Sequence, residues 1–407
     1  MLGTGQKTAA CGERRVRVLE VFSHLGVGGA ERWLLALLKY ARDHGPSLGV
    51  DAKFDILITG GARGPLDAEA GGLGAQLIYL KYSKRTMGAF VREYRRLLRE
   101  NSYDAIHDHL DHAAGFRFLF GFGRLPRTRI AHLHNPRLVV DSYASSVGRK
   151  LTVQLGFWLV RRFATHVLGT SNQLLREFGF ENGNRGSSRV KVDAAYCGFD
   201  VAAFRENRPG IRAEVCAEFG WRVDVRLILF VGRLDTNTAS ERNQKNPLFA
   251  LAVARRCIER DSAVHVLIAG KGGAVQPELE REVRSWGLEA NIRFLGVRND
   301  VSRLMLASDL LLFPSLAEGL GMVVVEAQAA GLPVLASDVV PREATVIPEL
   351  VSFRPLAAGA DSWATDCLRL LGNPPPNRMA CNDAVGQSQF AIEQSTRAIL
   401  GACQGAW

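Results

Sequence analysis

The stretch Leu310–Glu326 reads LLLFPSLAEGLGMVVVE and joins a short apolar run to a helix through a loop that contains two glycines. The run Leu310–Phe313 predicts a buried strand, and the residues from Met322 to Ala330 are typical of a helix. Glycines let backbone N–H groups approach a ligand, and a helix N-terminus favours phosphate. The stretch predicts a strand–loop–helix unit with a phosphate site; an acidic helix start without a ligand is the alternative.

The same alternation of strands and helices continues on both sides of this unit. Helical stretches such as Ala30–Arg42 lie between the apolar runs. The predicted strands are Val16–Phe22, Phe54–Ile58, Leu77–Leu80, Ala105–Asp108, Ile130–His134, Thr165–Gly169, Leu227–Val231, Val264–Ala269, Ile292–Leu295 and Pro333–Ala336. Such alternation predicts an α/β fold of two Rossmann-like halves with parallel sheets, which bind ligands beyond the carboxyl ends of their strands.

The boundary between the two halves follows from a loss of periodicity over Cys197–Pro209. We predict a disordered tail over residues 1–13, an N-terminal Rossmann-like domain over 14–205 and a C-terminal Rossmann-like domain over 206–387. Residues 388–407 are expected to form a last helix that packs back toward the N-terminal domain.

The composition is that of a globular protein. The chain has 407 residues, of which 47% are hydrophobic and 23% charged, a balance that excludes a disordered or collagenous protein. No apolar run reaches the roughly 18 residues of a membrane span. The N-terminus lacks the apolar segment of a secretory signal, and seven scattered cysteines predict reduced thiols, so we expect a cytoplasmic protein.

Excess positive charge is confined to the N-terminal half. Residues 1–200 contain 29 Lys and Arg against 18 Asp and Glu, whereas the whole chain has a net charge of +10. An anionic partner is therefore expected there, and the absence of a nucleic-acid-binding motif favours a phosphorylated substrate or a membrane surface over nucleic acid. The helix candidates Phe90–Arg99 and Arg149–Arg162 combine apolar and basic residues. They either rest on an anionic leaflet of the plasma membrane or cover a sheet with a solvated basic face.

Charged residues and glycines follow several predicted strands. Arg233 after Gly232, with Lys245 beyond a polar insertion, forms a pair that can neutralise a diphosphate, or else a solvated basic loop. Glu326 can accept hydrogen bonds from a ribose diol, and Glu318 is better suited to sugar hydroxyls. Backbone approach to a nucleotide or phosphate is expected at a further set of positions: Gly28, Gly29, Gly270 and Val297.

Histidines gather at two strand ends, in the segments HDHLDH (107–112) and HLH (132–134). Strand alternation points His107 and His132 away from the cleft and His109 and His134 into it, so His109 is the candidate that contacts a sugar. The first segment also matches the H-x-H-x-D-H motif of zinc hydrolases, in which His107, His109, Asp111 and His112 would bind zinc. A series of parallel strands is the wrong setting for that motif, and we predict no metal site.

Taken together, these stretches resemble the family-4 glycosyltransferases of GT-B architecture, and most of all those that build bacterial capsule or exopolysaccharide. The resemblance rests on VGGAERWLL, RIAHLHN, LFVGRL, QKNPLFAL, HVLIAGKGG and the long stretch around EGLGMVVVE. It implies retaining transfer from a nucleotide-diphosphate sugar, with a UDP-sugar favoured, and no metal or other cofactor. It also implies that the domain over 14–205 binds the acceptor, a saccharide or a lipid-linked carrier, and that the domain over 206–387 binds the nucleotide-sugar donor.

The resemblance also implies roles for the candidate residues. Glu326 would hold the ribose, Glu318 the donor sugar, and Arg233 and Lys245 the diphosphate, with His109 near the reacting carbon. The amides around Gly319, Leu320 and Gly321 would share the diphosphate, and Gly28 and Gly29 would face it from the other domain. Lys245 follows Arg233 at a greater distance than the family pattern has, which makes Arg242 an alternative. A catalytically inactive nucleotide-sugar-binding protein is the second functional hypothesis, and the zinc hydrolase is the third.

Overall fold

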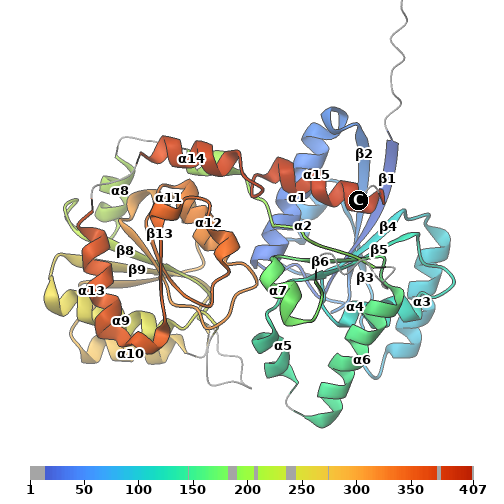
Figure 1. Ribbon diagram of the computed structural model, residues 1–407, viewed down its shortest axis with the longest axis horizontal. Coiled ribbons are helices and arrows are strands. Elements are labelled where there is room, and N and C mark those ends of the chain that lie inside the picture. Colours follow the sequence, from blue (N-terminus) through green and yellow to red (C-terminus); the bar gives the residue numbers. More distant parts are fainter. Residues whose placement is uncertain are drawn as a thin grey trace, which may run out of the picture.

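The N-terminal half of the chain folds around a seven-stranded parallel sheet (Figure 1). The computed structural model describes residues 14–144, 146–181, 190–205, 210–234, 244–273, 275–373 and 377–405. The strands are β1 (Arg14–Phe22), β2 (Val50–Ile58), β3 (Gln76–Tyr79), β4 (Ala105–Asp108), β5 (Thr128–Leu133), β6 (His166–Gly169) and β7 (Lys191–Ala194), in the order β3-β2-β1-β4-β5-β6-β7. All neighbouring strands are parallel, so their carboxyl ends share one edge.

Helices cover both faces of this sheet, because its central strands are apolar on both sides. They are α1 (Gly29–Leu48), α2 (Asp67–Gly72), α3 (Met87–Glu100), α4 (Ala113–Phe120), α5 (Arg137–Tyr143), α6 (Val147–Phe163) and α7 (Asn172–Glu177). One core contains Trp33 and Leu37 of α1, and the other contains Phe90 of α3, Phe118 of α4 and Phe157 of α6.

The C-terminal half forms a second parallel sheet with six strands in the order β10-β9-β8-β11-β12-β13. The strands are β8 (Arg226–Val231), β9 (Val264–Ala269), β10 (Ile292–Gly296), β11 (Leu310–Phe313), β12 (Val334–Ser337) and β13 (Val351–Arg354). The helices are α8 (Ile211–Glu218), α9 (Pro247–Arg260), α10 (Gln276–Ser285), α11 (Val301–Ala307), α12 (Met322–Ala329), α13 (Gly359–Leu371) and α14 (Arg378–Gly386). Short 3-10 turns are η1 (Val201–Phe204), η2 (Arg342–Ala344), η3 (Pro348–Leu350) and η4 (Leu356–Ala358). The predicted fold of two Rossmann-like α/β halves is confirmed.

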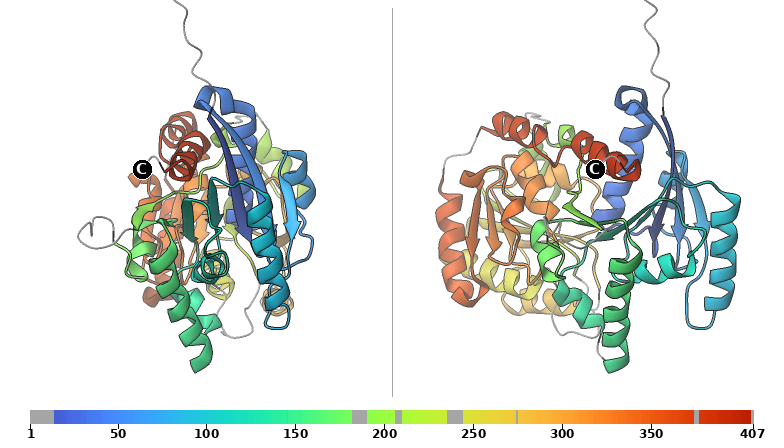
Figure 2. Two further views of the ribbon diagram at one scale, coloured as in Figure 1. Left: turned by 90° about the vertical axis from the view of Figure 1, so that its right-hand side faces the viewer. Right: turned by 45° about the vertical axis from the view of Figure 1, so that its right-hand side comes forward.

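The chain crosses between the halves twice, and the two crossings touch. Phe199, in the first crossing, forms a parallel β-bridge with Ala391, in the second crossing. The Phe199 N–H donates to the Phe390 carbonyl at 3.1 Å, and the Ile392 N–H donates to the Phe199 carbonyl at 3.1 Å. Helix α15 (Ile392–Cys403) then lies against α1 of the N-terminal half (Figures 1 and 2).

A buried hydrogen bond fastens α15 to that half. Trp33 Nε1 donates to Ser395 Oγ at 2.8 Å, and Ile399 and Leu400 join the core of the first sheet. The last helix of the chain is therefore part of the N-terminal body.

The two basic helices, for which the sequence leaves a membrane-facing and a sheet-covering alternative open, differ in what they bury. Helix α3 turns Phe90, Tyr94 and Leu98 into the core, so it is a sheet-covering helix. Helix α6 buries Phe157 and Val160 but leaves a second apolar stripe exposed. No helix in the described ranges is both long and apolar enough to span a bilayer. The tail over residues 1–13 and Arg242 lie outside the described residues.

Candidate active site

The carboxyl ends of the two sheets meet. Ser171, just after β6, donates from Oγ to the Gly319 carbonyl in the loop after β11 at 2.5 Å. Arg32 of α1 donates from Nη2 to Asn299 Oδ1, beyond β10, at 2.9 Å. The strand ends that bind ligands in such sheets therefore face one another across the domain boundary.

Glu343 is an interdomain contact that the sequence analysis missed. Its carboxylate accepts hydrogen bonds from the Asn172 and Gln173 N–H groups at 2.8 and 3.0 Å and from the Tyr196 hydroxyl at 2.8 Å. Burial and this carboxylate raise the pKa of Tyr196, so the phenol stays a donor. Two consecutive amides that bind one carboxylate fix the start of α7 against the C-terminal half.

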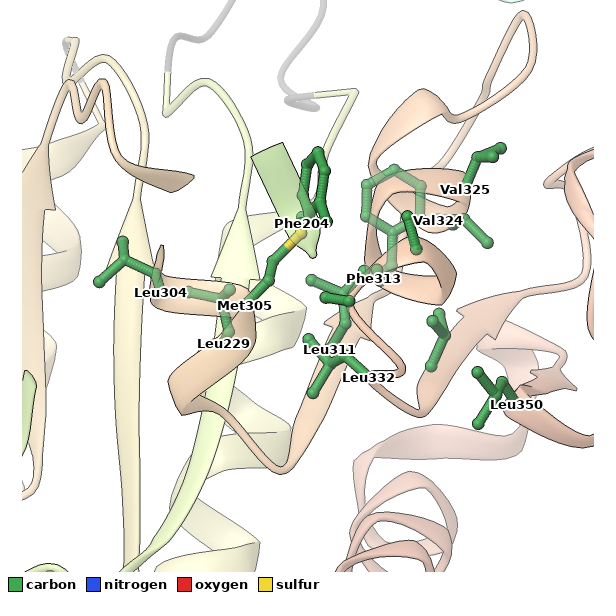
Figure 3. Close-up of a cluster of buried hydrophobic side chains, with 14 of the residues drawn as sticks. Phe204, Leu229, Leu304, Met305, Leu311, Phe313, Val324, Val325, Leu332 and Leu350 are labelled. Carbon is green, nitrogen blue, oxygen red and sulfur yellow. The ribbon is translucent and has the colours of Figure 1, made fainter. Parts of the chain in front are cut away.

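The loop between β11 and α12 is held firmly at both ends. Figure 3 shows Phe313 at the end of β11 and Val324 and Val325 of α12 within one buried apolar cluster. Gly321 caps the helix with φ of +88°, a conformation that costs a non-glycine residue energy. The amides of Leu320 and Gly321 therefore lie at a rigid helix N-terminus, as the phosphate prediction requires.

Lys245 and Glu318 come together in this loop. Lys245 Nζ lies 2.6 Å from Glu318 Oε1 and 4.9 Å from the centre of the Phe313 ring. Gln244 supports the pair, since its carbonyl accepts from the Leu316 N–H at 2.8 Å and its Nε2 donates to the Ala317 carbonyl at 2.7 Å. The polar insertion before residue 244 does not keep Lys245 away from the loop.

Glu326 lies in the first turns of α12, near the same ammonium group. Desolvation raises the pKa of its carboxyl group to about 7, and the charge of Lys245 opposes that rise. A carboxyl group that ionises near neutral pH in a partly exposed position is a common feature of functional sites. Lys245, Glu318 and Glu326 thus form one charged group beside the loop.

Glycines line the carboxyl ends of β8 and β9. A side chain on Gly270 would collide with the Gly232 carbonyl, and one on Gly232 would meet Cγ of Lys245 at 2.8 Å. The Gly232 N–H donates to the Ala269 carbonyl at 2.9 Å, which ties the two turns together. Arg233 follows directly and is exposed, so its guanidinium is reachable from solvent.

Gly319 lies at a contact between the two halves that the sequence did not predict. A Cβ atom there would collide with the His134 carbonyl and lie 2.8 Å from Thr170 Oγ1, both in the N-terminal half. The missing side chain lets the two halves approach each other. Its predicted contact with the diphosphate stays a prediction.

The glycine pair of the N-terminal half lies at the start of α1. Gly28 is the N-cap residue, and a side chain there would collide with the Glu31 carboxylate. Gly29, the first residue of the helix, has open space where its Cβ would be. Arg32, one turn further, contacts Asn299, so both glycines lie at the domain boundary.

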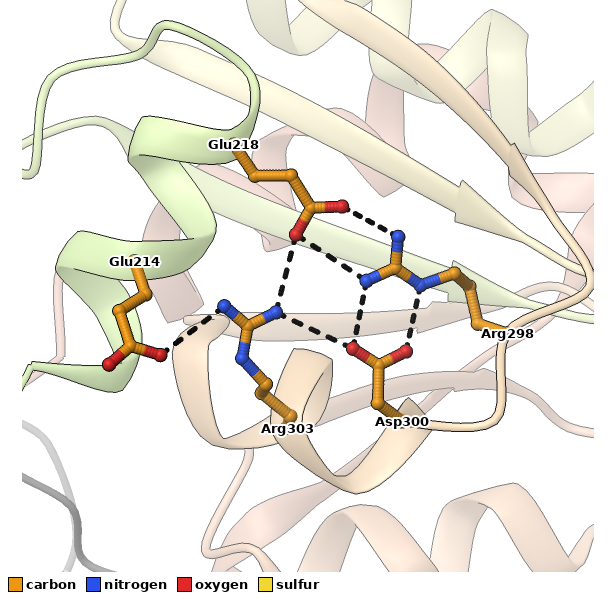
Figure 4. Close-up of polar contacts among 5 residues, drawn as sticks. All are labelled: Glu214, Glu218, Arg298, Asp300 and Arg303. Carbon is orange, nitrogen blue, oxygen red and sulfur yellow. Dashed lines mark hydrogen bonds and ion pairs between the residues drawn. The ribbon is translucent and has the colours of Figure 1, made fainter.

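Val297 follows β10 and is exposed, as a residue that approaches a nucleotide base should be. Its neighbour Arg298 is instead turned into an ion-pair network (Figure 4). Arg298 lies 2.6 Å from Glu218 Oε1 and 2.7 Å from Asp300 Oδ1, and Arg303 also contacts both acids. The network holds this loop to α8 and α11.

His109 is buried in this conformation, which corrects the expectation that it points into the cleft. Its Nε2 lies 2.7 Å from Glu20 Oε2 and its Nδ1 lies 2.9 Å from His134 Nε2. Strand β4 ends at Asp108 and β5 at Leu133, so the alternation used to separate the two pairs of histidines stops before His109 and His134. Glu20 was not singled out because it is one polar residue within an apolar strand.

The four residues of the H-x-H-x-D-H motif do not converge. Asp111, with φ of +46°, accepts from the His134 N–H and from Asn135 Nδ2, each at 2.8 Å. His112 packs against Phe157, with ring centres 5.8 Å apart. Since the sheets are parallel as well, the zinc-hydrolase hypothesis is wrong.

Comparison with known proteins agrees with this architecture. A model of the family described as "Glycosyltransferase Family 4" matches residues 27–202, and one described as "Glycosyl transferases group 1" matches residues 225–373. The two matches fall on the two halves of the fold. They define a glycosyltransferase of the two-domain GT-B class.

Relatives of known sequence agree with that assignment. "Putative glycosyltransferase EpsF" of Bacillus subtilis (strain 168) is 28% identical over 388 residues, which is 94% of this chain and 95% of EpsF. The D-inositol 3-phosphate glycosyltransferase of Mycobacterium tuberculosis (strain F11) is 31% identical over 225 residues, 53% of this chain and 44% of that protein.

Solved structures share the fold at low identity. Anabaena Alr3699/HepE, crystallised with UDP-glucose, gives a TM-score of 0.72 at 18% identity over 96% of this chain and 99% of that one. WaaG, a glycosyltransferase involved in lipopolysaccharide biosynthesis, gives 0.67 at 16% identity over 95% and 100%. The chain belongs to the GT-B glycosyltransferases, with a family 4 domain followed by a group 1 domain.

Proposed function

We propose that the protein is a retaining hexosyltransferase that uses a nucleotide-diphosphate sugar and needs no metal ion for the transfer step. The observation that supports this most directly is the convergence of Lys245, Glu318 and Glu326 beside the N-terminus of α12. An ammonium group, helix amides and two carboxylates provide groups for a diphosphate and for sugar and ribose hydroxyls.

The proposed mechanism follows from charge. Cleavage of the bond between sugar and phosphate leaves positive charge on the sugar and additional negative charge on the diphosphate. Lys245, Arg233 and the amides of Leu320 and Gly321 would stabilise that negative charge, a task that a divalent ion performs in other enzymes. The acceptor would attack the same face of the sugar, with the departing phosphate taking its proton.

We propose that the nucleotide released from the donor is UDP and that the transferred sugar is a hexose. HepE binds UDP and UDP-glucose, and its fold matches over nearly the whole chain. A thermal-shift panel of UDP, GDP, ADP and dTDP tests the nucleotide, since selective binding raises the melting temperature. A larger shift with another nucleotide would reject UDP.

The stereochemistry and the activity need a separate experiment. Proton NMR of the product of the UDP-hexose reaction should show the anomeric configuration of the donor. Inversion would reject the retaining mechanism. Nucleotide binding without donor-dependent product over a broad acceptor panel would favour an inactive binding protein. Full turnover in EDTA is expected, and loss of turnover there would contradict metal-independent transfer.

For the acceptor, we propose a saccharide on a lipid carrier in surface-polysaccharide synthesis, reached at an anionic bilayer. The exposed stripe of α6 supports this. Val147, Leu151, Leu155 and Trp158 recur at helical spacing and are 76%, 59%, 49% and 58% exposed. The helix contains four basic residues and no acidic one, and it projects from the N-terminal body (Figures 1 and 2). An apolar stripe beside basic side chains is complementary to an anionic leaflet.

Vesicle flotation tests the bilayer contact, with α3 as the matched control. The wild type is expected to float with vesicles that contain anionic lipid and to float less with neutral ones. A Leu151→Gln/Trp158→Gln variant should lose flotation. An Arg92→Gln/Arg96→Gln variant of α3, whose arginines already pair with Glu93 and Glu100, should retain it. Equal flotation of the wild type with both vesicle types would overturn the proposal.

A further inference from the structure

Two H-x-H repeats meet in the core of the N-terminal half. His107 lies within β4 and His109 directly follows that strand. His132 and His134 occupy the same two positions on the adjacent parallel strand β5. His107 Nε2 lies 3.0 Å from His132 Nδ1, and His109 Nδ1 lies 2.9 Å from His134 Nε2. One potential ligand atom from each of His107, His109 and His132 lies within 4.8 Å of the others. The donor site uses none of these three side chains.

A buried carboxylate completes the cluster from β1. Glu20 is fully buried, and its Oε2 lies 3.0 Å from His107 Nδ1 and 2.7 Å from His109 Nε2. Within the described part of the chain, these two histidines are its only ion-pair partners. The neighbouring cation Arg117 pairs with Asp108 instead, to which it donates from two guanidinium nitrogens.

All four side chains of the cluster are buried: Glu20 and His132 are fully buried, and His107 and His109 are 1% and 4% exposed. Bulk water therefore does not satisfy their polar atoms, which must be satisfied by one another or by a bound ion. Imidazoles and a carboxylate are the ligands that a divalent transition metal takes.

We propose that His107, His109, His132 and Glu20 bind a structural divalent metal ion, with Zn²⁺ the best match to three imidazoles and one carboxylate. Bonds of about 2.0–2.2 Å to one ion fix the spacing of the ligand atoms, so the side chains would shift on binding. His134 would then accept from His109 and fix its ring, as partners of metal-bound histidines do.

This ion would fasten β1, β4 and β5 together behind the domain boundary. The backbone of His134, next to the cluster, contacts Gly319 of the donor loop. Binding would therefore stabilise the edge against which that loop rests, without touching the reacting groups. The inference does not depend on the proposed function, because turnover without a catalytic metal and a structural ion in the core are compatible.

Metal analysis of the full-length, untagged protein tests the site. Protein produced in zinc-supplemented medium and freed of loosely bound metal should contain about one Zn²⁺ per chain. Replacement with Co²⁺ should produce the visible ligand-field absorption of a tetrahedral ion with nitrogen and oxygen ligands. X-ray absorption should report three imidazoles in the first coordination sphere.

Two variants locate the ion and one controls for them. His132→Gln and Glu20→Gln should each lower metal affinity by about 10- to 100-fold or more, and Zn²⁺ should no longer raise their melting temperature. His112→Gln removes a histidine of the same segment that lies outside the cluster, and it should retain the ion. The UDP-induced thermal shift of each variant reports whether it is folded.

Three results would overturn the proposal. The first is wild-type protein that binds UDP but contains no stoichiometric metal and gives no Co²⁺ spectrum. The second is equal loss of metal in His112→Gln and His132→Gln. The third is an absorption spectrum with sulfur ligands. If His132→Gln does not fold, the wild-type Co²⁺ and X-ray absorption spectra still decide the question. Failure of UDP binding in the wild type would instead count against the proposed function alone.

Discussion

The carboxyl ends of the two sheets both carry charged groups, but these groups differ in exposure. In the N-terminal half, Asp108 and Arg117 are buried and pair with each other. In the C-terminal half the charged groups stand beside a glycine loop, where Lys245 remains partly exposed and Arg233 is exposed. Substitutions at the carboxyl edge of the N-terminal sheet should therefore lower stability. Substitutions at the carboxyl edge of the C-terminal sheet should lower turnover.

The strongest test of this contrast is Lys245→Met. Loss of the ammonium group removes charge stabilisation from the leaving diphosphate, and we expect kcat/KM to fall by about 10³- to 10⁵-fold, as for other phosphate-clamping cations. Stability should also fall, because Glu318 is left buried and unpaired. Steady-state kinetics and urea unfolding measure the two effects.

A double variant separates these two effects. Lys245→Met/Glu318→Gln removes both charges and should recover most of the lost stability while turnover stays low. Recovery of turnover together with stability would mean that Lys245 only neutralises Glu318, and the contrast between the two edges would then fail.

The matching experiment on the N-terminal edge is Arg117→Met. It leaves Asp108 without its cation in the core, which should cost about 3–5 kcal/mol in the free energy of unfolding. UDP affinity of the folded protein should stay near the wild-type value. Asp108→Asn/Arg117→Met is expected to restore much of the stability. A large loss of UDP affinity at unchanged stability would contradict the assignment.

The contact between the edges is tested by Gly319→Ala. The added methyl group would push against the His134 carbonyl and Thr170, and overpacking of this kind costs about 1–3 kcal/mol. We expect a larger radius of gyration by small-angle X-ray scattering and a kcat/KM lowered by about 5- to 100-fold. Gly88→Ala in α3, whose methyl group meets open space away from the domain boundary, is the control and should change neither quantity.

The smallest expected effect concerns the ionisation of Glu326. Because its pKa is raised to about 7 in the folded state, the stability that its protonated form contributes is present at low pH and is lost as the pH rises through 7. Glu326→Gln should therefore match the wild type in stability only below the ordinary carboxyl pKa of 4.5, and its excess stability should grow as the pH rises to 7 and then level off at about 1–3 kcal/mol. Melting curves across that range measure this, and a pH-independent difference would reject the shifted pKa. The variant should still bind UDP less tightly.

The fold was largely predictable because central strands of parallel sheets are continuous apolar runs. Ala105–Asp108, Val264–Ala269 and Leu310–Phe313 were predicted with the bounds that the structure has. The strands that the sequence analysis missed, β7 and β13, are sheet edges. Edge strands carry polar residues and are only half covered, so Lys191–Ala194 lacks the apolar signal.

The sequence predicts those parts of the candidate site that lie close together along the chain. It does not predict contacts between residues that are far apart in the sequence. Glu318 and Glu326 share one loop and helix, so their spacing alone indicates that they lie together. The meeting of Glu20 with His109, and of Glu343 with Tyr196, depends on strand order and domain contact, which a single sequence does not encode in any short pattern. The burial of His109 could not be foreseen for the same reason.

The paired crossings at Phe199 and Ala391 have a mechanical consequence. A single linker would let one half rotate in any direction relative to the other. Two adjacent connections that are hydrogen-bonded to each other act as a hinge. Relative motion of the halves is thereby limited chiefly to a swing about one line, so the donor loop should return to the same place beside α7 at each cycle. The paired crossings thus contribute to the precision with which the two halves form the active site.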